Sequence, residues 1–219
     1  AVDAAEPWTV YAERQVQAQA AQAWSQCATL AGNSDILREL DRSLAARGVV
    51  GEHRAARLVY LSARSRGLDR PVSIAVKGPS SGGKSYLVDQ VLEHFPREAF
   101  YALSAMSERA LAYSEEPLKH RMLVIYEAAG MSGDFASYLI RSLLSEGCVR
   151  YETVEKTPEG IRPRLIEREG PTGLITTTTA VSLHPENETR LLSIPVTDTP
   201  AQTQQILRAL SQDRKDRRA

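Results

Sequence analysis

The sequence predicts an α/β protein in which helices cover a mainly parallel sheet and an all-helical segment precedes that sheet. Two observations lead to this fold class. Up to about residue 70 the periodic stretches have helical spacing, whereas after Pro71 short apolar runs alternate with amphipathic ones. Strands that alternate with helices along a chain are typical of parallel sheets with helices packed on their faces.

The N-terminal segment is expected to form three helices. The first covers residues 10–32 and is rich in Ala and Gln, which favour helices. In the second, residues 34–48, the apolar side chains share one face: Ile36, Leu37, Leu40 and Leu44. The third covers residues 52–66. Trp8 and Trp24 are expected to pack this segment together.

The rest of the chain alternates between strands and helices. The expected strands are residues 71–78, 98–104, an apolar run within 119–130, 173–180 and 190–196. The expected helices are residues 83–95, 107–113, 132–147 and 199–212. Residues 148–169 form two alternating runs around a turn with Pro158 and Gly160, which predicts a β-hairpin inserted between a helix and a strand.

Composition narrows the class of protein. Lys plus Arg equals Asp plus Glu at 27 each, so a nucleic-acid site has to be a local patch of charge. Cys27 and Cys148 form no CxxC pair, which argues against a disulfide scaffold or a cysteine zinc site. No apolar run approaches the roughly 20 residues of a membrane span, and no signal-peptide pattern is present. We therefore expect a soluble cytoplasmic protein without a membrane partner.

A phosphate-binding loop is the strongest motif in the sequence. The pattern G-x-x-x-x-G-K-[ST] is matched by Gly78, Pro79, Ser80, Ser81, Gly82, Gly83, Lys84 and Ser85. Glycines let backbone N–H groups converge on phosphate oxygens at the start of a helix, and Tyr86 belongs to the same first turn. Lys84 would reach the β- and γ-phosphates, and Ser85 would place its hydroxyl on Mg²⁺. A Gly/Ser-rich turn is the alternative, but a strand precedes the loop and a helix follows it, so we expect ATP and Mg²⁺ as ligands.

An acidic residue is expected at the end of a neighbouring strand. Residues 122–125 are four apolar residues, and Tyr126 and Glu127 follow them. In the additional-strand ATPases this run usually ends in Asp-Glu, where the Asp orients magnesium and the Glu activates water. Glu127 is the expected base, or else an ordinary salt-bridged carboxylate. Tyr126 replaces the Asp, which predicts weaker magnesium binding without abolishing it.

Further stretches resemble AAA+ ATPases and follow in the same order as in that family. Val49, Val50 and Gly51 precede a helix, at the place where AAA+ modules hold the adenine; a simple helix connector is the alternative. The run "LITTTT" resembles the sensor-1 strand, whose polar end senses the γ-phosphate. Thr177 and Thr178 are the candidates there, and we assign the catalytic role to Thr178. Thr176 and Thr179 stay open, as does a plain threonine-rich strand.

The stretch "HPENETRLLSIPV" is similar to minichromosome-maintenance helicases. In that family an Arg before the final strand reaches the γ-phosphate held by the next subunit, and this position maps onto Arg190. A surface Arg paired with Glu186 or Glu188 is the alternative. The predicted hairpin also has a counterpart in those helicases, where it projects into the channel of the ring and touches DNA.

The hairpin supplies the candidate DNA-binding residues. They are Lys156 near the tip and Arg162 and Arg164 behind it, whose contacts with phosphates would not depend on sequence. Glu152, Glu155 and Glu159 dilute this positive charge, so an ordinary surface hairpin is the alternative.

The resemblance extends from about Val49 to Leu210 and indicates the pre-sensor hairpin group of AAA+ ATPases. Within that group the chain is most similar to helicase modules of phage and mobile-element primase–helicases. We assign residues 1–48 to a helical segment, 49–212 to the ATPase core and 213–219 to a charged tail. The small helical lid of AAA+ modules is expected to be missing, and we favour the explanation that the chain is part of a longer protein.

The resemblance implies a ring-forming, ATP-hydrolysing DNA helicase or translocase of a replication system, hexameric and acting on single-stranded DNA. A nucleotide-switched DNA-binding or loader ATPase with slow hydrolysis is the first alternative. A P-loop kinase with a small-molecule acceptor is the second.

Overall fold

The computed structural model describes residues 8–127, 133–158, 160–180 and 185–216. The chain forms two compact units, residues 1–42 and 43–219. α1 (Trp8–Ala31) lies in the first unit, and α2 (Ile36–Ala46) spans the boundary. Trp8 is 77% exposed and Trp24 is 64% exposed, so the expectation that they pack this segment is wrong. Within the described ranges, no helix is both long and apolar enough to cross a membrane.

The second unit is built on a five-stranded parallel sheet with the strand order β2-β3-β6-β1-β7. The strands are β1 (Ile74–Lys77), β2 (Phe100–Leu103), β3 (Arg121–Ile125), β6 (Thr172–Thr178) and β7 (Leu192–Pro195). β6 lies between the strand that leads into the phosphate-binding loop and the strand that ends at the acidic residue. This arrangement confirms the predicted α/β fold with a parallel sheet.

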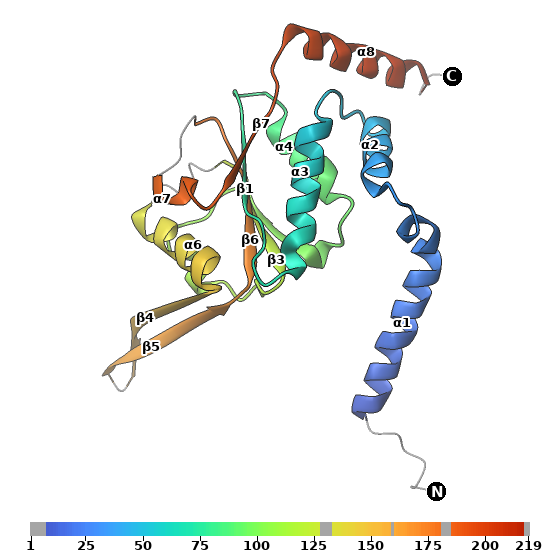
Figure 1. Ribbon diagram of the computed structural model, residues 1–219. Coiled ribbons are helices and arrows are strands. Elements are labelled where there is room, and N and C mark those ends of the chain that lie inside the picture. The colour runs from blue at the N-terminus through green and yellow to red at the C-terminus, as the bar shows by residue number, and fades with distance from the viewer. Residues whose placement is uncertain (1–7, 128–132, 159, 181–184, 217–219) are drawn as a thin grey trace, which may run out of the picture. The chain divides into compact units, whose positions relative to one another are not determined.

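Helices cover both faces of the sheet (Figure 1). α3 (His53–Arg64) and α4 (Lys84–Leu92) lie on one face, and α6 (Asp134–Glu146) lies on the other. The shorter helical elements are η1 (Ser65–Gly67), η2 (Arg97–Ala99), α5 (Ala110–Tyr113) and α7 (Pro185–Glu188), and α8 (Pro200–Asp216) follows β7. α8 therefore continues beyond residue 212, where the sequence predicted its end.

The core forms because apolar residues recur at helical spacing on α6 and in continuous runs on the central strands. The buried residues of α6 at positions i, i+3, i+4 and i+7 are Ala136, Leu139, Ile140 and Leu143. Leu139, Ile140 and Leu143 pack in one cluster with Ala75, Leu123, Ile125 and Leu174 of the sheet. Strands buried on both faces are apolar at most positions, which explains why β1 and β3 appear as apolar runs without alternation.

The predicted hairpin is present and projects from the body of the second unit (Figure 1). β4 (Cys148–Thr157) pairs antiparallel with β5 (Gly160–Glu169) over ten residues of each strand. Only its base is anchored: Ile166 is buried, and the ring of Tyr151 meets Phe135 of α6 edge-on at a centroid distance of 5.0 Å. Toward the tip, Val154 and Ile161 are 70% and 74% exposed.

Two isoleucines on β5 allow a test of this anchoring. Ile166→Ala should lower the free energy of unfolding by about 2–4 kcal/mol, because it removes buried apolar contacts at the base. Ile161→Ala should change it by no more than about 0.5 kcal/mol, because that side chain is solvated at the tip. Urea unfolding of both variants measures the difference, and equal losses would contradict an anchored base and a free tip.

Candidate phosphate-binding site

The phosphate-binding loop leaves β1 at the centre of the sheet. The N–H of Gly78 donates to the carbonyl of Thr178 at 3.2 Å, and the N–H of Val196 donates to the carbonyl of Lys77 at 2.8 Å. The loop therefore begins while both neighbouring strands still hold the backbone. A Cβ atom at Gly78 would overlap the side chain of Val196, so this position admits no side chain without movement.

Lys84 is folded into the loop that it closes. Its Nζ donates to the carbonyls of Gly78 at 3.0 Å and Pro79 at 2.6 Å, and the residue is only 7% exposed. Gly83 precedes α4 at φ +75°, a left-handed conformation that glycine adopts without strain. An ammonium group beside the amino end of a helix is a suitable environment for phosphate oxygens.

The other residues of the loop are accessible. Pro79, Ser80, Ser81 and Ser85 are exposed, and Ser85 lies in the first turn of α4. Ser81 has φ +63°, which is uncommon for a residue other than glycine and marks a constrained turn.

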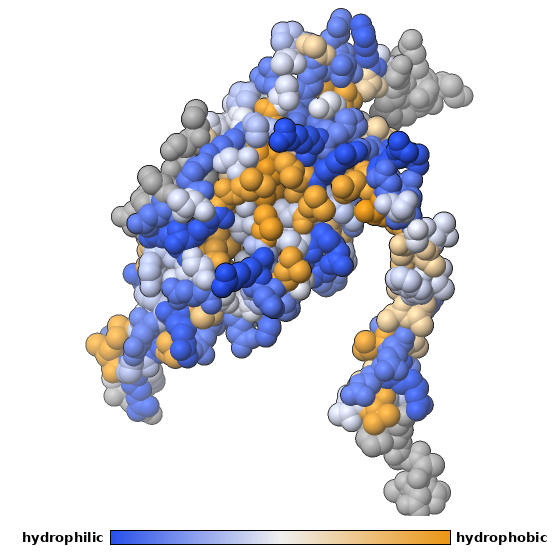
Figure 2. Space-filling model, viewed as in Figure 1, coloured by the Kyte–Doolittle hydropathy of each residue, from blue (hydrophilic) through white to orange (hydrophobic). Residues whose placement is uncertain are grey.

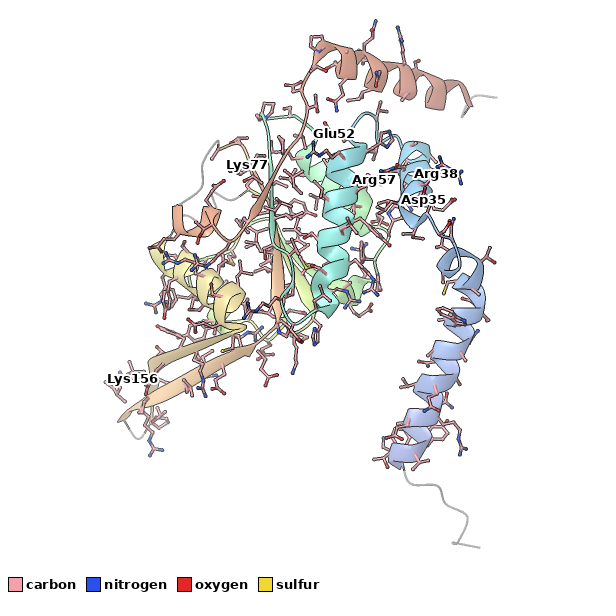
Figure 3. The ribbon with its side chains drawn as sticks, in the orientation of Figure 1. Asp35, Arg38, Glu52, Arg57, Lys77 and Lys156 are labelled. Carbon is pink, nitrogen blue, oxygen red and sulfur yellow. The ribbon has the colours of Figure 1, made fainter. Side chains whose placement is uncertain are left out.

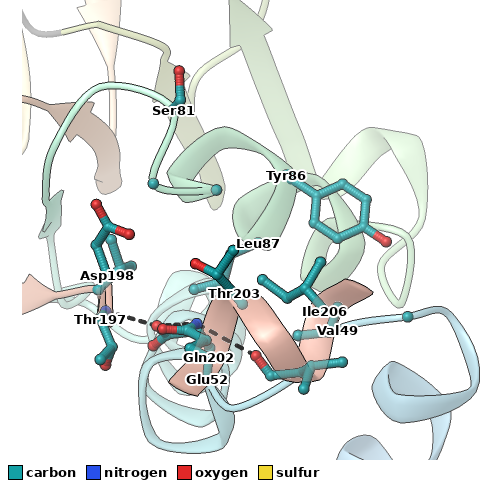
Figure 4. A pocket seen from close by; sticks show the side chains of 15 residues that line it. Val49, Glu52, Ser81, Tyr86, Leu87, Thr197, Asp198, Gln202, Thr203 and Ile206 are labelled. Carbon is teal, nitrogen blue, oxygen red and sulfur yellow. Dashed lines mark hydrogen bonds between the residues drawn. The ribbon is translucent and has the colours of Figure 1, made fainter. Parts of the chain in front are cut away.

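A pocket of about 350 Å³ opens beside the loop (Figure 4). Its lining includes Gly82 and Gly83 of the loop together with Tyr86 of α4, whose hydroxyl donates to the carbonyl of Arg47 at 2.8 Å. The apolar side chains of the lining are Val49, Val50, Leu87, Val196 and Ile206. Val50, which the sequence predicts to contact the base of a nucleotide, thus lines the pocket beside the loop. Gly51 has φ +78° and does not line the pocket.

A carboxylate joins the chain segments that frame this pocket. Oε1 of Glu52 accepts from the N–H of Thr197 at 2.7 Å and from Nε2 of Gln202 at 2.9 Å (Figure 4). Nε2 of Gln202 also donates to the carbonyl of Val50 at 3.4 Å. These bonds tie the start of α3 to the start of α8 across 150 residues of sequence, a separation at which sequence spacing gives no signal.

The acidic residue lies just beyond β3 and next to β6. Glu127 is exposed and has φ +68°, and its N–H donates to Oγ1 of Thr177 at 3.0 Å. The hydroxyl of Thr178 instead accepts from the N–H of Ala180 at 3.0 Å, and that of Thr176 donates to the carbonyl of Ile125 at 2.9 Å. The structure therefore brings Thr177 to Glu127, and it places Thr178 beside the start of the phosphate-binding loop.

Tyr126 faces the helix that follows the loop. Its hydroxyl donates to Oδ1 of Asp89, which lies on α4. Burial, and then the hydrogen bond and negative charge of Asp89, raise the pKa of Tyr126 above its usual range, so the phenol stays protonated at neutral pH. Sequence reasoning missed Asp89, although its position four residues after Ser85 was a usable signal.

Arg190 lies outside the loop and belongs to the surface formed by α6 and α7. Its Nε donates to Oγ of Ser145 at 2.7 Å, and Nη1 donates to the carbonyl of Glu186. The carboxylate of Glu186 pairs with Arg141, and the carboxylate of Glu188 pairs with Lys77 at the end of β1. The two carboxylates that the sequence offered as partners of Arg190 are thus bonded to other cations.

The candidate DNA-binding residues are divided between the two faces of the hairpin. Lys156 is paired with Ile161, whereas Arg162 is paired with Glu155 on the adjacent register position. Side chains of successive strand residues point to opposite faces, so Lys156 shares its face with Val154. Nη1 of Arg164 meets Oε1 of Glu155 at 3.3 Å on the other face. Lys156 lies at the end of the hairpin far from the sheet (Figure 3).

The donor set fits a nucleotide with its Mg²⁺. In the part of the chain that the structure describes, no group of three or more His, Cys, Asp or Glu residues could hold a metal ion by itself. Mg²⁺ in nucleotide sites takes most of its ligands from phosphates and water, so one hydroxyl and nearby carboxylates are sufficient. Ser85 would supply the hydroxyl, and Lys84 with the amino end of α4 would hold the phosphates.

Residues 33–212 match the protein-family model described as MTBMA_p00010 P-loop domain. The chain belongs to this family. No curated protein matches the chain. Among solved structures, the crystal structure of a full-length MCM homolog from Methanopyrus kandleri is similar, with a TM-score of 0.52 and 14% sequence identity. The similarity covers 80% of this chain and 40% of that protein, and at this identity it shows the P-loop NTPase fold alone.

Within this P-loop domain, the contact between Gly78 and Val196 can be tested. Gly78→Ala should lower the free energy of unfolding by about 1–3 kcal/mol and weaken nucleotide binding, because the added methyl group displaces the loop from β7. Val196→Ala should restore binding in the double variant by making room for that methyl group. Urea unfolding and equilibrium nucleotide binding report the two effects. A double variant no better than Gly78→Ala would contradict this explanation.

Proposed function

We propose that residues 49–212 are the ATPase core of a ring-forming DNA helicase or translocase of a replication system. The observation that supports the proposal is that three functional groups follow neighbouring strands at the carboxyl edge of the parallel sheet. Lys84 closes the loop after β1, and Glu127 follows β3 with its N–H on Thr177 of β6. A phosphate site beside a carboxylate and a hydroxyl has the composition needed for hydrolysis of a nucleoside triphosphate.

Each group has a defined task in the proposed reaction. Residues 78–85 bind the phosphates of ATP, and Lys84 neutralises part of their charge. Glu127 orients the attacking water and accepts its proton, and Thr177 holds the backbone of Glu127 in place. This assignment uses Thr177 where the sequence favoured Thr178. The apolar pocket that includes Val50 receives the base, and Mg²⁺ supplies charge neutralisation on the phosphates when it is bound.

We infer that Arg190 acts on the ATP of a neighbouring subunit in a hexamer. Its guanidinium is exposed and bonds to neutral acceptors on α6 and α7, none of which belongs to the phosphate-binding loop. A cation presented at the surface without a carboxylate partner among the described residues is available to an anion on another chain. An arginine supplied in this way stabilises the charge of the transition state.

The hairpin is the proposed contact to single-stranded DNA. Lys156 stands among exposed apolar residues at the tip, and Figure 2 shows apolar residues at the end of the hairpin. A cation beside an apolar surface suits a strand whose phosphates and unpaired bases are both accessible. Arg162 and Arg164, on the face shared with Glu155, are the secondary contacts of this proposal.

A nucleotide-switched DNA-binding or loader ATPase is a second candidate. Tyr126 favours it, since a tyrosine bonded to Asp89 replaces the residue that usually orients magnesium. A small-molecule kinase is less favoured, because Arg162 and Arg164 lie on a regular strand of the hairpin instead of a lid over the phosphates.

ATP turnover in the presence and absence of single-stranded DNA tests the motor. Glu127→Gln should reduce turnover by about 100-fold or more while ATP binding persists, because it removes the general base. Lys84→Ala should abolish binding. Arg190→Ala should lose turnover by about 1,000-fold and regain part of it when mixed with Lys84→Ala subunits, which bind no ATP but supply an intact arginine.

These outcomes separate the two candidates. DNA-stimulated turnover that mixing restores supports the ring motor. Tight ATP binding without turnover under any DNA condition would overturn the motor and support the switch. Absence of ATP binding by the unaltered protein would contradict both.

The tip of the hairpin predicts a second result. Lys156→Ala should weaken binding to single-stranded oligonucleotides about five-fold, because a solvated ion contact contributes about 1 kcal/mol. The loss should be the same for dT and dA oligomers, since phosphate contacts carry no sequence information. Lys119→Ala is the matched control, because Lys119 is exposed and pairs with Glu169 at the base of the hairpin. Equal losses in fluorescence anisotropy for both variants would contradict a contact at the tip.

A further inference from the structure

At the end of β3, the position before Glu127 carries no carboxylate. Tyr126 occupies this position, and its N–H is fixed by the carbonyl of Leu103 at 3.0 Å, so the side chain has a defined place at the strand end. A tyrosine at this position brings no second carboxylate oxygen to a cation at the strand end. Any second carboxylate for Mg²⁺ therefore has to come from another element.

Asp89 of α4 can supply this second carboxylate, because it lies across from the end of β3. It lies on α4 four residues after Ser85, so the two side chains occupy one face of the helix with Cβ atoms about 5–6 Å apart. Asp89 is exposed, and Tyr126 donates to its Oδ1. The hydrogen bond thus holds a helix carboxylate beside the end of β3, one turn from the hydroxyl expected at the metal.

The remaining bonding capacity of Asp89 suits a hydrated cation. A carboxylate offers about four lone-pair sites on two oxygens, and Tyr126 uses one of them. Mg²⁺ gives up its water reluctantly, and carboxylates often bind it through that water.

We propose that Asp89, oriented by the hydroxyl of Tyr126, supplies the carboxylate that β3 lacks and binds the water shell of the Mg²⁺ that accompanies the nucleotide. The inference rests on the proposed nucleotide site. Asp89 is a positioning residue, because Ser85 and the phosphates are the direct ligands. Tyr126 is then part of the site, where the sequence alone presented it as a defect.

The test measures binding of a fluorescent ATP analogue as MgCl₂ is titrated, and again in EDTA. The Mg²⁺ midpoint is the Mg²⁺ concentration at which Mg²⁺ has half of its full effect on binding of the analogue. Asp89→Asn should raise this midpoint by about ten-fold, because loss of an outer-shell partner weakens other metal sites by a similar factor. Affinity in EDTA should not fall, because the change removes a negative charge from the neighbourhood of the phosphates. Tyr126→Phe should shift the Mg²⁺ midpoint in the same direction by a smaller factor.

The double variant Asp89→Asn, Tyr126→Asp returns the carboxylate to β3. It should recover most of the Mg²⁺ dependence, whereas a purely structural role for Asp89 predicts no rescue. Glu93→Gln is the matched control: Glu93 is exposed at the C-cap of α4, one turn farther from the loop.

The outcomes are separable. A midpoint for Asp89→Asn equal to that of the unaltered protein would overturn the inference and leave the nucleotide site intact. Equal losses with Mg²⁺ and in EDTA would assign Asp89 to the structure of the helix, and would also overturn it. No binding by the unaltered protein in either condition would overturn the proposed function itself.

Discussion

The position of β1 between β6 and β7 is the constraint on which the site depends. Backbone hydrogen bonds from Gly78 to Thr178 and from Val196 to Lys77 hold the chain on both sides at the point where the loop begins. The same two bonds place the threonine-rich end of β6 and the segment leading to α8 beside the loop. The position of the phosphate-binding loop, the polar strand end and the pocket beside the loop are therefore consequences of one register in a parallel sheet.

Glu52 extends this constraint to the other wall of the pocket. α8 follows β7 after a short segment, and the carboxylate of Glu52 binds both that segment and Gln202 on α8. Because the carboxylate receives both donors, removing it would leave the N–H of Thr197 without its acceptor and Nε2 of Gln202 with only the longer bond to the carbonyl of Val50. The pocket is thus shaped by polar contacts between segments that lie far apart in the sequence, in addition to its apolar lining.

Local patterns in the sequence predicted what depends on local structure. The loop from Gly78 to Ser85 is contiguous, and the apolar faces and runs that predicted α6, β3 and the hairpin are properties of short windows. Which threonine bonds to the backbone of Glu127 was beyond sequence reasoning, because it depends on which face of β6 turns toward Glu127. Asp89 was missed because its partner, Tyr126, is 37 residues away. Trp8 and Trp24 were misjudged because large apolar residues were assumed to pack, although their spacing along α1 places them on different sides of the helix.

The division of the hairpin into two faces has a consequence for counterion release. On one face Arg164 is already neutralised by Glu155, which also stands opposite Arg162, whereas Lys156 stands on the other face beside apolar residues. Each hairpin would then displace about one condensed counterion from a single strand, a shallow dependence of affinity on the logarithm of salt concentration. Under the proposed function, the affinity of the assembly for single-stranded DNA would depend on the number of hairpins that bind the strand at once. A single subunit would bind the DNA strand weakly, and a closed assembly would bind it tightly.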